Sequence, residues 1–73
     1  MATDVPIRGD MIRLGQLLKL AGLLDGGGEV KAFLAATDVR VNGEPEDRRG
    51  RQLAPGDVVV AGEHELRVVS GTG

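Results

Sequence analysis

Apolar residues recur at helical spacing in the first half of the chain. From Met11 onward the chain shows the i, i+3, i+4, i+7 pattern of an amphipathic helix, which is formed by Leu14, Leu17, Leu18 and Ala21. Gly22 suits the end of this helix, because glycine tolerates a left-handed backbone there. The pattern therefore predicts a first helix that buries one leucine-rich face.

A second short helix is predicted for Glu29–Ala36, where the same spacing is carried by Val30, Phe33 and Leu34. Asp25 can cap this helix by accepting hydrogen bonds from its free amides. The glycines that follow, Gly26–Gly28, allow a tight turn between the two helices. Two helices this short are not stable alone, so they must pack on another element.

The second half of the chain alternates apolar and polar residues, as half-buried strands do. Asn42-Gly43 is typical of a type I′ hairpin turn, which would pair Arg40–Val41 with Glu44–Pro45. Pro45 lacks an N–H group, so we expect it at a sheet edge. The other expected elements are a strand or ordered arm within residues 1–10, a turn at 55–57, a strand at 58–60, a turn at 62–64, a strand around 66–68 and a frayed tail at 70–73. This order predicts an α+β fold, with two short packed helices against a small antiparallel sheet.

The composition excludes several classes of protein. The chain has 73 residues, enough for a single domain, and it has no cysteine for disulfides, cysteine-bound zinc or thiol catalysis. With one histidine, His64, and one serine, Ser70, we expect no catalytic site, no metal or other cofactor and no small-molecule substrate. No stretch resembles a membrane span or a signal peptide, so we expect a cytoplasmic protein.

The charge distribution gives two opposing indications. A formal net charge of -2 argues mildly against a nucleic-acid partner, and a single Phe without Trp or Tyr provides no platform for stacking bases. Against this, Arg48, Arg49 and Arg51 form a basic cluster whose guanidinium groups can bind phosphates. The alternative is a solvated surface loop, in which these arginines pair with the neighbouring carboxylates of Glu44, Glu46 and Asp47.

The glycine-rich segment offers a second phosphate contact. Gly27 and Gly28 come just before the second helix, where free backbone amides can bind an anion. The alternative is a turn in which glycine only allows the helices to approach closely. Both interpretations can hold together.

Five segments form an ordered set along the chain: Ile12–Leu23, Gly27–Lys31, Val39–Glu44, Arg48–Leu53 and Pro55–Val59. In this order and spacing they resemble the S4 RNA-binding domain, which is named after ribosomal small-subunit protein four and is also called the alpha-L motif. The stand-alone bacterial YbcJ-like proteins are the subgroup that the chain resembles. The resemblance runs from about Ile7 to Val69 and implies one RNA-binding domain, in which two packed helices lie against a small curved sheet.

The resemblance also implies that structured RNA binds to one face of the helix pair and the adjoining loop. By position it places these residues on that face: Arg13, Lys19, Lys31, Arg40, Asn42, Arg48, Arg49 and Arg51. The chain departs from the family pattern at Gly15, where an acidic residue is usual, at Gly26-Gly27 in place of Ser-Arg, and at Thr37, where glycine commonly ends the second helix. The first departure leaves the helix start less defined, and the second lowers the expected affinity.

We therefore expect a non-catalytic protein that binds structured RNA, such as a ribosomal stem-loop, through its backbone and shape. We also expect the acidic residues to lie mainly on the opposite face. One alternative is a ubiquitin-like sulfur carrier, although such carriers end in Gly-Gly, begin with a hairpin before the main helix, and this chain ends Gly71-Thr72-Gly73. The other is a protein-interaction adaptor that acts through Glu44, Glu46, Asp47, Glu63 and Glu65.

Overall fold

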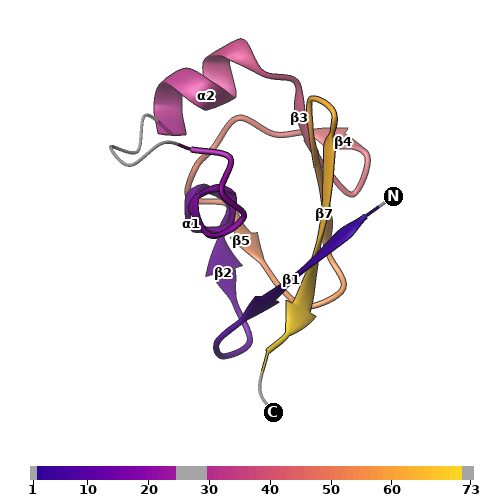
Figure 1. Cartoon of the computed structure of the whole chain (residues 1–73). Helices are drawn as coiled ribbons and strands as arrows, with labels where there is room; N and C mark the ends of the chain where they lie inside the picture. The colour runs from indigo at the N-terminus through magenta and orange to yellow at the C-terminus, as the bar shows by residue number, and fades with distance from the viewer. Residues whose placement is uncertain (1, 25–29, 72–73) are drawn as a thin grey trace.

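The computed structural model describes residues 2–24 and 30–71, and it has helices and strands in one α+β arrangement (Figure 1). The elements are β1 Thr3–Ile7, β2 Ile12–Arg13, α1 Leu14–Leu20, α2 Val30–Ala36, β3 Val39–Val41, β4 Glu44–Pro45, β5 Gln52–Leu53, β6 Val58–Ala61 and β7 His64–Ser70. The predicted α+β class is confirmed. The predicted cap at Asp25, the turn at Gly26–Gly28 and the helix start at Glu29 lie outside the described residues.

The strands form a five-stranded sheet in the order β1-β7-β6-β3-β4 and a separate pair, β2-β5. The expectation of a wholly antiparallel sheet is wrong at one edge, because β1 pairs with β7 in parallel. Parallel neighbours require a long crossover between them, and here it is the whole of the chain from β2 to β6. The expected frayed tail is also wrong at its start, since Ser70 belongs to β7 and the Gly71 N–H donates to the Ile7 carbonyl at 3.0 Å.

The predicted hairpin is confirmed in its register. Arg40 lies opposite Pro45 and Val41 opposite Glu44, while Asn42 and Gly43 have φ of 52° and 86°. Positive φ at both central residues is what a type I′ turn requires. β4 is one of the two edge strands of this sheet, so Pro45 lies where its missing N–H costs no sheet hydrogen bond.

Asn42 also joins this hairpin to the turn before β6. Its side-chain amide donates to Asp57 Oδ1 at 3.1 Å, and its Oδ1 accepts from the Val58 N–H at 2.9 Å. The second Asp57 oxygen accepts from the Ala54 N–H at 2.9 Å. Asn42 therefore has two roles: it adopts the positive φ that the hairpin turn requires, and its side chain connects this turn to the turn at 55–57.

Replacing Asn42 with alanine should lower the free energy of unfolding by about 1 to 2 kcal/mol, because it removes these hydrogen bonds and places alanine at positive φ. Asn42→Gly removes the same bonds but tolerates the backbone, so its loss should be smaller. Urea unfolding of both variants measures the difference. Equal losses would show that the backbone conformation contributes nothing.

The core lies between the helices and the sheet, with both helices on one side of the sheet (Figure 1). α1 buries Leu14, Leu17 and Leu18 completely, as its spacing predicts. α1 begins later than the pattern suggests, because Ile12–Arg13 pairs with Gln52–Leu53 as a short antiparallel ladder. This pairing brings residues 46–51, here called the arginine loop, to the start of α1, because they immediately precede β5.

Candidate nucleic-acid interface

The start of α1 is capped by the backbone of the arginine loop. Arg13 occupies the N-cap position without a side-chain capping bond. The first helical N–H groups, those of Leu14 and Gly15, instead donate to the carbonyls of Arg51 and Arg49 at 2.9 and 3.0 Å. The helix start is therefore well defined in spite of the unusual Gly15, and the loop is fixed beside it.

Gly15 lies where three segments approach one another closely. A Cβ atom on this residue would lie 3.2 Å from Val30 Cγ1 on α2 and 3.4 Å from Arg49 Cβ on the loop. Any larger side chain would push α2 or the loop away from α1. Glycine at this position therefore allows α1, α2 and the loop to meet around one hollow.

That hollow, the basic cleft, is lined by Arg13, Gly15, Gln16, Lys19, Val30, Arg49 and Gly50. An adjoining hollow is lined by Lys31, Leu34, Asp47 and Arg49, so Arg49 stands between the two. Four cations from separate elements thus lie around one surface: Arg13, Lys19, Lys31 and Arg49. Within residues 2–24 and 30–71, none of these side chains makes an ion pair or hydrogen bond.

Arg48 and Arg51, by contrast, are engaged by a buried carboxylate. Glu46, whose side chain is 5% exposed, accepts from Arg48 Nε at 3.0 Å and from Arg51 Nη1 at 2.8 Å. It also accepts from the Arg48 backbone N–H at 3.1 Å. We call this arrangement the Glu46 clamp. The side-chain hydrogen bond from Arg48 is the largest cause that lowers the pKa of Glu46 from 4.5 to about 2, against the opposing effect of burial.

Comparison with known proteins decides the family. The model of the S4 domain family matches residues 5–69 of this chain. The chain belongs to the S4 domain family. It is also 48% identical over 71 residues to the probable ribosome maturation protein RlbA of Bacillus subtilis (strain 168), an alignment that covers 96% of this chain and 100% of the relative.

The family predicted from the sequence is therefore confirmed, and the matched range nearly coincides with the expected core. The described elements also argue against the sulfur-carrier alternative. β1 pairs with β7 and β2 with β5, so no hairpin precedes the main helix.

The other predicted site residues of this S4 domain lie apart from the basic cleft or outside the described chain. Arg40 on β3 pairs with Asp38 at 3.4 Å, and the Asn42 amide is used within the fold. Gly27 and Gly28 lie outside the described residues. Thr37 does not need the left-handed backbone that the family glycine suggests, since Asn42 alone among the described non-glycine residues has positive φ.

The acidic residues do not keep to an opposite face, because Asp47 lies beside Lys31 and Arg49, and Glu46 lies inside the arginine loop. Sequence reasoning also missed Arg8, which follows β1 and lines a groove on the other side of Lys19. An isolated cation in a short arm gives no periodic signal. Its one local indication is the neighbouring Gly9, which turns the chain with φ of 74°.

The described residues contain no group of three or more His, Cys, Asp or Glu side chains that could hold a metal ion. Of the helices in that part of the chain, none has the length and apolar character needed to cross a membrane.

Proposed function

We propose that this S4 domain is a non-catalytic RNA-binding protein that binds structured RNA through the basic cleft. The observation that carries the proposal is the grouping of Arg13, Lys19, Lys31 and Arg49 around one surface, in a chain whose net charge is -2. Cations without a protein partner remain available for phosphate oxygens. A local excess of positive charge matters more for such binding than the average over all faces.

The shape of the cleft suits a nucleic-acid backbone. Gly50 is exposed and contributes no side chain to its lining, so a phosphate can approach the backbone of the loop there. The family supports RNA as the ligand, and the name of the relative RlbA, which concerns ribosome maturation, supports ribosomal RNA as its source. Recognition would rest on phosphate positions and RNA shape.

We expect the remaining predicted residues to contribute less to RNA binding. Arg48 and Arg51 lie next to the cleft, but each must share its guanidinium with Glu46 before it can reach a phosphate. Arg40 on β3 and Asn42 in the turn after it lie apart from the cleft, so they would contact RNA only beyond it, and the predicted phosphate contact at Gly27 and Gly28 lies outside the described residues. We therefore expect Arg13, Lys19, Lys31 and Arg49 to make the principal contacts.

Salt dependence tests the proposal directly. Binding of a fluorescent ribosomal stem-loop RNA should weaken with increasing salt, with a slope that corresponds to about two to four phosphates. Fluorescence anisotropy over a series of KCl concentrations measures the slope. Failure to bind at low salt, or binding that salt does not weaken, would contradict an interface built on phosphate contacts.

A further inference from the structure

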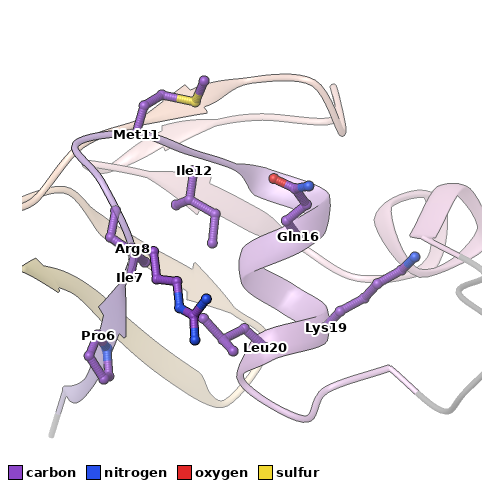
Figure 2. A pocket seen from close by; sticks show the side chains of 8 residues that line it. All are labelled: Pro6, Ile7, Arg8, Met11, Ile12, Gln16, Lys19 and Leu20. Carbon is purple, nitrogen blue, oxygen red and sulfur yellow. The ribbon is translucent and has the colours of Figure 1, made fainter. Parts of the chain in front are cut away.

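An apolar groove lies beside the basic cleft, between β1 and α1 (Figure 2). It has a volume of about 610 Å³, and Ile7, Ile12 and Leu20 contribute to its lining. Met11 and Leu20 at its edge are 43% and 57% exposed, and they are the exposed large apolar side chains of the described residues. Such side chains gathered at one groove indicate a binding surface.

The charged residues that line this groove are all cations. They are Arg8 and Lys19, and within residues 2–24 and 30–71 neither makes an ion pair or hydrogen bond. Figure 2 shows Arg8 and Leu20 projecting into the space between β1 and α1, while Lys19 extends from α1 away from Leu20. The occupant must therefore combine an apolar part with negative charge.

The groove is continuous with the basic cleft. Gln16 and Lys19 line both, so a chain of phosphates bound in the cleft would pass the mouth of the groove. An apolar floor cannot hold a phosphate, but it can bury the face of a base that is not paired. The planar Arg8 guanidinium can stack on that base, and the Gln16 amide offers both donors and an acceptor to its edge.

We propose that this groove binds an unpaired nucleotide of the RNA, with its base against Leu20 and Ile12 and its phosphates near Arg8 and Lys19. This inference rests on the proposed function and adds a preference for RNA in which a base is free to leave the helix. It also gives this S4 domain a means of base recognition that requires no aromatic side chain.

Two RNA duplexes of matched length test the inference, one fully paired and one with a single bulged 2-aminopurine. The protein should bind the bulged RNA about fivefold to tenfold more tightly, because apolar surface is buried on the base. Met11→Gln/Leu20→Gln should abolish this preference and leave binding of the paired RNA unchanged. The control Ala36→Gln/Ala54→Gln, at exposed positions that do not line the groove, should keep the preference.

The outcomes separate the two proposals. Salt-sensitive binding of both RNAs with equal affinity would overturn the nucleotide site and leave the proposed function intact, whereas binding of neither RNA would overturn both. A photoreactive benzophenone amino acid in place of Leu20 should crosslink to RNA in ribosomal particles. Crosslinks only to protein, whether a ribosomal protein or a second copy of this chain, would assign the groove to a protein partner and refute the inference.

Discussion

Replacing Arg49 with glutamate should weaken binding of a ribosomal stem-loop RNA by about tenfold to a hundredfold at low salt, because a charge-assisted hydrogen bond to phosphate is lost and a repulsive charge takes its place. Arg49 stands between the two hollows that hold the other free cations. Its side chain is not engaged by another described residue, so none of its charge is already neutralised within the fold. Fluorescence anisotropy measures the change.

Arg67→Glu is the matched control for this experiment. It makes the same change in net charge on β7, where Arg67 pairs with Asp4 at 2.9 Å and lines none of the hollows at the basic cleft. Its effect on binding should be no more than about threefold. Similar losses in both variants would mean that RNA responds to net charge alone and that the cleft is not the interface.

The Glu46 clamp predicts that the three arginines of the arginine loop contribute unequally to RNA binding. Reversal of Arg48, Arg49 and Arg51 together should remove most of the binding, as the sequence alone suggests. The structure assigns the largest share of that loss to Arg49, because the other two arginines already bind Glu46. Glutamate at Arg48 or Arg51 alone should therefore weaken binding less than Arg49→Glu.

Local patterns predicted those parts of the fold that neighbouring residues determine. Asn42-Gly43 specified both the turn and its register, and Gly22 has the positive φ, 79°, expected just beyond the first helix. The parallel pairing of β1 with β7 was not predictable in this way, because Thr3 meets Leu66 across nearly the whole chain. Strand direction at that edge depends on the path of every element between them.

The sequence indicated which residues belong to the candidate site, but not how these residues are arranged in space. The family resemblance identified the cationic residues of the site. It could not show which of them are free, because a charged segment such as 46–51 has the same composition whether or not one of its carboxylates is buried. The burial of Glu46 separates Arg49, which stays free, from Arg48 and Arg51, which do not. The reason for glycine at position 15 likewise appears only when α2 and the loop are placed against it.

Replacing Glu46 with alanine should lower the free energy of unfolding by about 1 to 3 kcal/mol at neutral pH, since the arginine loop loses its internal acceptor. The loss stays below that of a fully buried ion pair, because Arg48 and Arg51 are 72% and 37% exposed and can turn to water. Urea unfolding measures it. Glu44→Ala, an exposed carboxylate two residues away, should change stability by no more than about 0.5 kcal/mol.

The clamp also predicts how stability depends on pH. Folding lowers the pKa of Glu46 from 4.5 to about 2, so the clamp stabilises the fold fully above the unfolded value and loses this contribution as pH falls towards 2. Glu46→Gln has no such ionisation. The stability difference between the protein and this variant should therefore be largest above about pH 5 and shrink towards about pH 2. A difference that stays constant over this range would show that the carboxylate charge is not what holds the loop.

Glu46→Gln should at the same time keep its affinity for RNA or gain some, because it releases Arg48 and Arg51 from a competing anion. Its salt slope should then rise by about one phosphate. Glu46→Gln should thus lower the stability and keep the affinity for RNA. Arg49→Glu should do the reverse, with weaker RNA binding and unchanged stability. Loss of binding in Glu46→Gln while it remains folded would instead mean that the clamped arginines are themselves part of the RNA contact.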